Sequence, residues 1–204
     1  DEMRLVRFKE QRKAAIVGEF AAQVMLDIPS KIIKDVSRNE PVDDILKVLR
    51  ATKPKYVYTH NLADKHDTHV GVALRLITAL RMLDPSERPE RVVGCEVWRA
   101  LDWMVDPDKV LMNVSDHENL QAALLGVFDS QIVGGKRYDL ASMGRRRANA
   151  TYFESHGVDA TTGLSYAMDM TLLMNDAGKN PAQFTQEFIQ RFAQDVNERI
   201  GRMS

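Results

Sequence analysis

Apolar side chains recur every three or four residues in several stretches of the chain, which is the period of a helix with one buried face. This period predicts helices over residues 4–24, 39–50, 66–83 and 117–130. A further helix is predicted from Asn180-Pro181, because Pro is favoured in the first turn of a helix. Its apolar positions repeat every four residues, at Phe184, Phe188, Phe192, Val196 and Ile200. A stripe of this kind indicates core packing or a subunit contact.

Shorter stretches rich in β-branched and aromatic residues predict strands over residues 55–59, 91–100 and 109–114. Strands separated by helices of this length are typical of an α/β fold with a mainly parallel sheet covered on both faces. At 204 residues, with no composition that marks a linker, the chain is expected to form a single domain over residues 1–204.

The segment from Lys55 to Leu83 contains three of the five histidines, and polar residues mark its junction between predicted strand and predicted helix. The polar side chains at this junction are His60, Asp64, His66, Asp67 and His69. In open α/β sheets, ligands bind outside the carboxyl ends of the strands, where these residues fall. Apolar residues follow the two helical histidines at helical spacing, at Ala73, Ile77 and Leu80, which predicts that the histidines begin the buried face.

Two histidines three residues apart on one helical turn can face a single point, as a zinc or iron site requires. His66 and His69 have this spacing, but not the four-residue spacing of the zincin motif. Two other interpretations stay open. Asp67 or Thr68 could simply cap the helix, with ordinary hydrogen-bonded histidines beside it, or the His-Asp pair could belong to a helical metal phosphohydrolase.

The predicted strand, the polar loop, His66-Asp67-Thr68-His69 and the apolar helix together resemble the His-Pro-Asp-His signature of the PIG-L or LmbE-like zinc deacetylases. Residues 7–15 resemble the family's Arg-x-x-Glu-x-x-x-Ala-Ala helix, residues 54–59 its Pro-x-x-Val-x-Thr strand, and residues 114–131 its helix ending in His-x-Ser-Gln. Thr68 and Phe128 depart from these patterns, where the family usually has aspartate and histidine.

The resemblance implies a Rossmann-like, three-layer LmbE-type domain and metal-dependent removal of an N-acetyl group from an amino sugar or its conjugate. It implies zinc, or another divalent metal, bound by His69. It also implies that His66 acts catalytically on the oxyanion and the departing amine, with Asp64 and Asp67 orienting the metal ligand and Arg7 contacting the substrate. The family's first signature, Pro-His-Pro-Asp-Asp-Glu, is absent and the chain begins at Asp1. We therefore expect a domain whose N-terminal strand is missing and which is inactive without it.

Charge and cysteine content narrow the expected partners. With 28 basic and 29 acidic residues the net charge is −1, which leaves no electrostatic footprint for nucleic acid or an anionic membrane. Cys95 is the only cysteine, so the chain can form no internal disulfide and suits a reducing cytoplasm. No apolar run has the length of a bilayer span, and no signal peptide is recognisable.

A basic run over residues 136–156 is the remaining candidate for ligand binding. It contains Arg145, Arg146, Arg147 and Asn149, and we expect Arg145 and Asn149 to bind the substrate in an anion or sugar clamp, with the arginines binding a phosphate or carboxylate. The alternative is a solvated helix face. For the whole chain, the alternative to an enzyme is a non-catalytic sugar-binding or accessory module of a larger amino-sugar enzyme, associated with a second copy or with a missing N-terminal segment.

Overall fold

The computed structural model describes residues 2–153 and 160–204, which form helices around a mixed β-sheet. The chain divides into two compact units. The first combines residues 1–25 with residues 112–165, and the second combines residues 26–111 with residues 166–204. Each unit is thus built from two separate parts of the chain, and no linker composition in the sequence marks the division.

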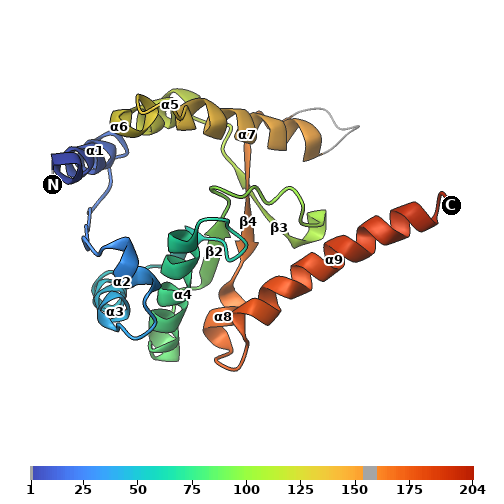
Figure 1. The fold of residues 1–204 in the computed structure, drawn as a ribbon, viewed down its shortest axis with the longest axis horizontal. Coiled ribbons are helices and arrows are strands. Elements are labelled where there is room, and N and C mark those ends of the chain that lie inside the picture. The colour runs from blue at the N-terminus through green and yellow to red at the C-terminus, as the bar shows by residue number, and fades with distance from the viewer. Residues whose placement is uncertain (1, 154–159) are drawn as a thin grey trace. The chain divides into compact units, whose positions relative to one another are not determined.

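The first unit is mainly helical, and its elements are α1 (Glu2–Val17), α5 (Glu118–Gly126), α6 (Asp129–Ile132) and α7 (Tyr138–Phe153). The second unit contains α2 (Ser30–Lys34), α3 (Glu40–Thr52), β1 (Tyr56–His60), α4 (Asp67–Arg81), β2 (Arg91–Cys95), α8 (Thr171–Asn175) and α9 (Pro181–Gly201), with short 3-10 turns at Pro85–Glu87 and Asp106–Asp108. Strands β3 (Lys109–Asn113) and β4 (Leu164–Asp169) run across the boundary between the units. Figure 1 labels the α-helices and the strands β2, β3 and β4.

Within the described residues, four strands form one sheet in the order β1-β2-β4-β3. Strand β1 pairs with β2 in parallel, with Tyr56 opposite Arg91 and His60 opposite Cys95. Strand β4 runs antiparallel to β2, with Cys95 opposite Ala167. The α/β prediction is therefore confirmed, with an antiparallel strand added to the parallel pair. Because β1 and β2 are parallel neighbours, the loops that follow them leave the same edge of the sheet.

The core of the second unit lies between the sheet and helices α4 and α8. Ala73, Ile77 and Leu80 of α4 are at most 2% exposed, which confirms the buried face predicted from their spacing. Helix α4 contacts β1 and α8, and the apolar residues Val92 of β2 and Met168 of β4 are fully buried in the same unit. Helix α3 lies alongside α4 (Figure 1), so the histidine-bearing helix is held from two sides.

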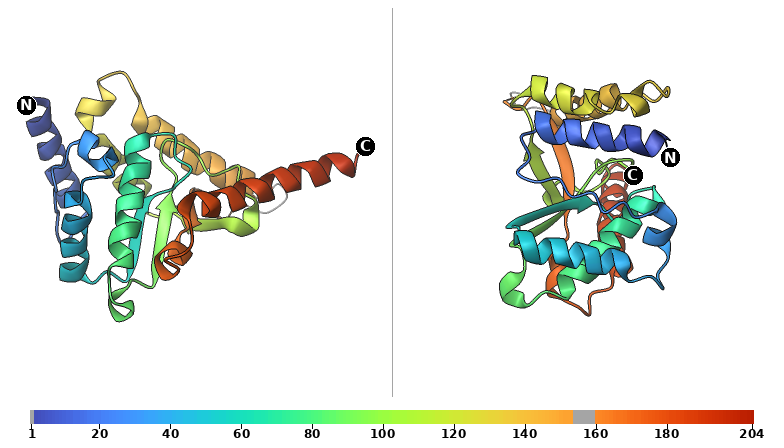
Figure 2. Two further views of the ribbon diagram at one scale, coloured as in Figure 1. Left: turned by 60° about the horizontal axis from the view of Figure 1, so that its bottom comes forward. Right: turned by 90° about the vertical axis from the view of Figure 1, so that its left-hand side faces the viewer.

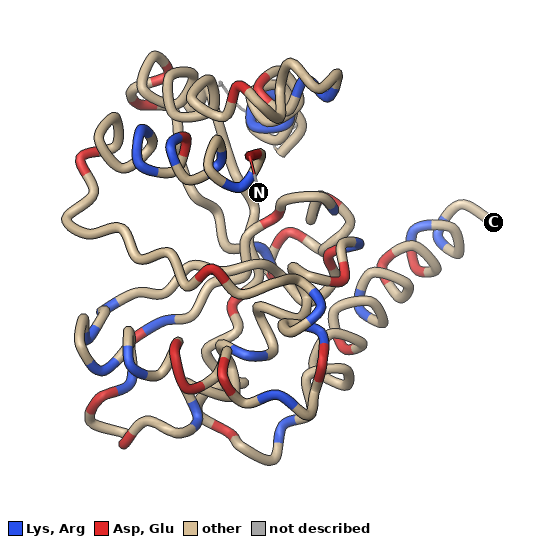
Figure 3. Tube along the Cα trace, turned by 60° about the vertical axis from the view of Figure 1, so that its left-hand side comes forward, with Lys and Arg blue, Asp and Glu red and all other residues tan. Residues whose placement is uncertain are grey.

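Helix α9 begins after α8 and extends as one long helix (Figure 2). Its first turns bury Phe184 and Phe188, whereas Phe192, Val196 and Ile200 are 37%, 37% and 57% exposed. The predicted aromatic stripe is thus core only in its first half. Among the helices of the described residues, none combines the length and the apolar character that crossing a bilayer requires. Figure 3 shows acidic and basic residues interspersed along most of the chain trace.

Several predicted boundaries were wrong for local reasons. Helix α1 ends at Val17 rather than at residue 24, because Glu19 takes a left-handed conformation with φ of 51°. Strand β2 ends at Cys95 rather than at residue 100, because the Glu96 carboxylate accepts backbone N–H groups of Leu101 and Tyr166 and turns the chain. The helix predicted over residues 117–130 is two helices, α5 and α6, separated at Phe128, which has non-helical dihedral angles.

Candidate functional site

The candidate site lies where β1 passes through a polar loop into α4, and Asp64 is its centre. The Asp64 side chain is 0% exposed. Its Oδ1 accepts the backbone N–H of His66 at 2.9 Å, and its Oδ2 accepts the backbone N–H of Trp98 at 3.0 Å. Since Trp98 follows β2 and His66 follows β1, this one carboxylate joins the two loops that leave the edge of the sheet.

These hydrogen bonds also determine the charge of Asp64. Burial by itself would raise the pKa of this carboxyl, but the N–H groups of His66 and Trp98 and the nearby His69 outweigh it and hold the pKa below its usual value. Asp64 is therefore an anion at neutral pH. The helix does not use Asp67 or Thr68 as a side-chain cap, since its N-cap residue is His66 and makes no side-chain capping bond.

His69, on the first turn of α4, faces this carboxylate. Its Nδ1 lies 3.5 Å from Asp64 Oδ2, which is ion-pair range but outside hydrogen-bond geometry, and this buried Nδ1 has no hydrogen-bond partner within the described residues. The His60 ring stacks on His69 with centroids 3.9 Å apart and planes 6° from parallel, and the His66 ring lies at 4.5 Å and 24° on His69. Three imidazoles and one buried carboxylate thus form a single cluster.

His60 behaves differently from an exposed histidine. Burial first, and then the neighbouring His69, lower the pKa of its imidazole to about 4, because together they outweigh the opposite effect of Asp64. His60 is therefore neutral at pH 7. Its Nδ1 is buried and, like that of His69, has no hydrogen-bond partner among the residues described.

The cluster does not form a closed metal site. Imidazole binds a metal through a lone pair in the plane of its ring, so stacked parallel rings direct their lone pairs side by side and not to one point. Across residues 2–153 and 160–204, no group of three or more His, Cys, Asp or Glu side chains is arranged to hold a metal ion. The geometry accommodates His69 as one ligand at most.

Sequence reasoning named most of this cluster but missed Asn61 and Trp98. Asn61 is fully buried, and its Nδ2 donates to the Cys95 carbonyl at 2.9 Å, which adds a second link between the ends of β1 and β2. The centroid of the Trp98 indole ring lies 5.7 Å from the centroid of the His66 imidazole ring. Neither residue is marked by a motif, and the only signal would have been the parallel pairing of β1 with β2.

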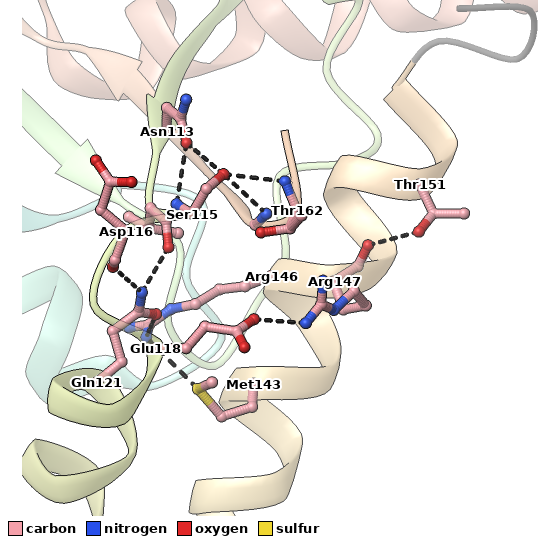
Figure 4. A network of polar contacts seen from close by, with 12 residues as sticks. Asn113, Ser115, Asp116, Glu118, Gln121, Met143, Arg146, Arg147, Thr151 and Thr162 are labelled. Carbon is pink, nitrogen blue, oxygen red and sulfur yellow. Dashed lines mark hydrogen bonds and ion pairs between the residues drawn. The ribbon is translucent and has the colours of Figure 1, made fainter. Parts of the chain in front are cut away.

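The other predicted binding residues belong to the first unit. Arg7 is exposed on α1, and Arg145 lies on α7. Their neighbours already make contacts within the unit (Figure 4): Arg146 donates to Gln121 at 2.6 Å and Arg147 pairs with Glu118. These two bonds attach α7 to α5.

Asn149 is buried, and its Nδ2 donates to the Leu164 carbonyl at 3.2 Å, where it supports the packing of α7 on β4. Glu154, Ser155 and His156, at the end of the basic run, lie outside the described residues.

Two of the stretches that resemble the deacetylase family meet in this unit. Glu10 of α1 is 5% exposed, and its carboxylate accepts the Ser130 backbone N–H at 2.6 Å and the Ser130 hydroxyl at 2.8 Å. Ser130 lies in the first turn of α6, so Glu10 satisfies a donor that the helix itself leaves free. The glutamate of the first stretch and the serine of the last therefore have a shared structural role.

Comparison with known proteins addresses the fold. No family model matches the sequence, and a search of curated proteins found no match. Among solved structures, the chain is similar to the conserved protein TT1542 from Thermus thermophilus, with a TM-score of 0.59 and 18% identity over 81% of this chain and 73% of that one. It is also similar to GalB, the 4-carboxy-2-hydroxymuconate hydratase from Pseudomonas putida, with a TM-score of 0.52 and 12% identity over 81% and 71% of the two chains. At these identities the likeness shows the fold alone, a Rossmann-like α/β arrangement.

Proposed function

We propose that the protein is a hydrolase that removes an N-acetyl group from an amino sugar or its conjugate. The observation that carries the proposal is the pairing of the buried, anionic Asp64 with His69 at the carboxyl end of β1. The resemblance of His66-Asp67-Thr68-His69 to a deacetylase signature supports the same activity. A cytoplasmic location is part of the proposal, since a single cysteine suits a reducing compartment.

The chemistry follows from the placement of the two histidines. A carboxylate beside Nδ1 of an imidazole favours the tautomer that carries its proton there, which leaves the Nε2 lone pair available as a base or ligand. In the reaction, the oxygen of water bonds to the acyl carbon, the carbon–nitrogen bond breaks, and the departing nitrogen takes up a proton. His66 is exposed at the start of α4 beside His69, where it can deliver that proton.

Only one contact to a metal is assigned to this chain. We propose His69 as a ligand of zinc or another divalent ion, oriented by Asp64, while Asp67 is exposed on the first helical turn beside them. The described residues do not complete the ligand set. The test of this contact is therefore metal binding itself, and not the activity of a loaded enzyme.

The deciding experiment measures metal content and acetate release in parallel. Acetate release from N-acetylglucosamine is followed with and without added zinc, and bound zinc is determined by elemental analysis. His69→Ala is expected to remove zinc binding. His66→Ala is expected to retain zinc and, where a complete ligand set supports acetate release, to slow turnover by about 10² to 10⁴, the usual value of general acid–base catalysis. The matched control is His117→Asn, at an exposed histidine whose left-handed backbone suits asparagine. Full zinc occupancy in His69→Ala would contradict the metal assignment, and normal turnover in His66→Ala would contradict the catalytic one.

The incomplete ligand set favours one second candidate, a non-catalytic sugar-binding module. Such a module would bind N-acetylglucosamine reversibly and release no acetate under any metal condition. The same assay, combined with a binding measurement, separates the two candidates.

A further inference from the structure

A pocket of about 500 Å³ opens beside Asp64, within the second unit. We call it the Arg99 pocket. It is lined by residues of the loop after β1, of the segment after β2 and of helix α9, namely Leu62, Ala63, Asp64, Arg99, Trp103, Thr185, Ile189 and Phe192. Its volume is in the range of small-molecule sites. The residue that supports the histidine cluster, Asp64, therefore also lines a ligand-sized space.

One part of the pocket is apolar and aromatic. Ile189 and Phe192 of α9 are 40% and 37% exposed, and both line the pocket. The rings of Trp103 and Phe192 meet edge to face, with centroids 6.3 Å apart. Large apolar side chains left accessible in a concave site are the usual lining for the body of a small ligand.

Two polar groups of the pocket are donors without partners. Arg99 forms no hydrogen bond or ion pair within the described part of the chain, whereas Arg91 pairs with Asp169 at 2.8 Å. The indole Nε1 of Trp103 is buried and has no hydrogen-bond partner among the residues described. A buried N–H group that lacks a partner costs free energy, which a ligand that accepts its hydrogen bond would recover.

The carboxylate of Asp64 does not cancel this preference for a ligand that accepts hydrogen bonds. Both oxygens of Asp64 already accept backbone N–H groups, which stabilise its negative charge, and the side chain is 0% exposed, so the carboxylate does not contact a ligand in the pocket. Among the described residues, the exposed group of the pocket without a partner is therefore the Arg99 guanidinium, while the unpaired Trp103 N–H is buried. Both are donors only, and the guanidinium fork matches the two oxygens of a carboxylate or phosphate.

We propose that the Arg99 pocket binds an anionic group, a carboxylate or a phosphate, on the body of the amino-sugar substrate. This inference rests on the proposed function for the substrate's N-acetyl end, which the histidine cluster would receive. It places the anion-binding arginine in the second unit, in contrast to the basic run of α7, where Arg146 and Arg147 already have acidic or amide partners.

The test is a binding measurement by isothermal titration calorimetry with three probes. These are N-acetylglucosamine, N-acetylglucosamine 6-phosphate and N-acetylmuramic acid, which carry no anionic group, a phosphate and a carboxylate respectively. The wild-type chain is expected to bind at least one anionic probe about 10- to 100-fold more tightly than the neutral one, because hydrogen bonds to a charged group are worth about 1.5 to 3 kcal/mol. The phosphate and carboxylate arms show which anion the pocket selects.

The variants are Arg99→Ala, Arg99→Lys, Trp103→Phe and the competing-site control Arg145→Ala. Arg99→Ala should abolish the preference for the anionic probe, Arg99→Lys should retain part of it, Trp103→Phe should weaken it, and Arg145→Ala should leave it unchanged. Since Arg99 is exposed, its variants should unfold at the wild-type urea midpoint. A wild-type chain without charge preference, or an Arg99→Ala variant that keeps it, would overturn the inference, and a loss confined to Arg145→Ala would move the anion site to α7.

The proposed function can fail separately from this inference. Suppose that binding is charge-selective and depends on Arg99, but no acetate is released under any metal condition. That result would support anion binding by the Arg99 pocket and contradict the hydrolase assignment. Acetate release could instead be equally fast in the wild type and in Arg99→Ala, on anionic and neutral substrates alike. That result would support the hydrolase assignment and contradict anion binding by the Arg99 pocket.

Discussion

Replacement of Asp64 by alanine is the most informative single change, because one buried carboxylate holds two loops. The variant leaves the backbone N–H groups of His66 and Trp98 without their acceptor. A buried donor that loses its partner costs about 1 to 3 kcal/mol, so two of them predict a loss of about 3 kcal/mol or more in the free energy of unfolding. That is a large fraction of the stability of an ordinary domain, which is about 5 to 15 kcal/mol.

The Asp64→Asn variant separates charge from shape. Asparagine has nearly the same volume, but it offers one oxygen where two N–H groups need acceptors, and its amide turns a donor toward the other. We expect it to lose about half as much stability as Asp64→Ala. The matched control is Asp67→Ala, three residues away and exposed on the first turn of α4. Its loss removes only a favourable charge near the helix N-terminus, worth about 0.3 to 1 kcal/mol.

Urea unfolding followed by tryptophan fluorescence suits these variants, because Trp98 and Trp103 are the chain's two tryptophans and both lie in the unit that contains Asp64. With an m-value of about 1 to 3 kcal/mol per molar urea, a loss of about 3 kcal/mol lowers the midpoint by about 1 to 3 M. If Asp64→Ala unfolded at the same midpoint as Asp67→Ala, the carboxylate would not be the link between the loops, and the geometry on which the candidate site rests would be refuted.

Three further predictions concern other parts of the chain. Glu10→Ala removes the acceptor of the Ser130 N–H and hydroxyl, so hydrogen exchange in α6 should speed up and stability should fall by about 2 kcal/mol, with Glu10→Gln intermediate; unchanged exchange would contradict the link. Asn180 caps α9 by accepting two backbone N–H groups, so Asn180→Ala should cost about 1 kcal/mol in thermal or urea unfolding while Asn180→Asp costs little. Burial raises the pKa of the Cys95 thiol to about 11, so iodoacetamide at pH 8 should alkylate it about 100-fold more slowly in the native chain than in urea, and equal rates would contradict its burial.

Local patterns were sufficient for the elements that use one helical face or one short strand. The apolar period predicted the buried face of α4 through Ala73, Ile77 and Leu80, because a helix must bury such a stripe wherever its partners lie. The polar residues after β1 indicated the candidate site, since a parallel strand followed by a helix opens a crevice at that edge of the sheet. In both cases the information lies within a few residues of the chain.

Strand β4 shows where local patterns fail. Its sequence from Leu164 to Asp169 has no clear alternation, and it becomes a strand by pairing with distant neighbours in the sheet, β2 more than 70 residues earlier and β3. Its residues Tyr166, Ala167 and Met168 are nearly fully buried, because a strand in the middle of a sheet is covered by neighbouring elements. The strand's own sequence does not predict which elements these are. The early end of β2 has the same origin, since Glu96 accepts an N–H of Tyr166.

The site repeats this contrast. Residue types and spacing indicated His66, His69 and Asp64, but the stacking of His60 on His69 and the hydrogen bond from Trp98 to Asp64 depend on β1 lying beside β2. The Arg99 pocket combines segments from residues 62 to 192, and each of the two units joins parts of the chain more than 50 residues apart. The apolar period of one segment predicts which of its faces is buried. Contacts between distant segments depend on which surfaces pack together, and only the tertiary structure determines this packing.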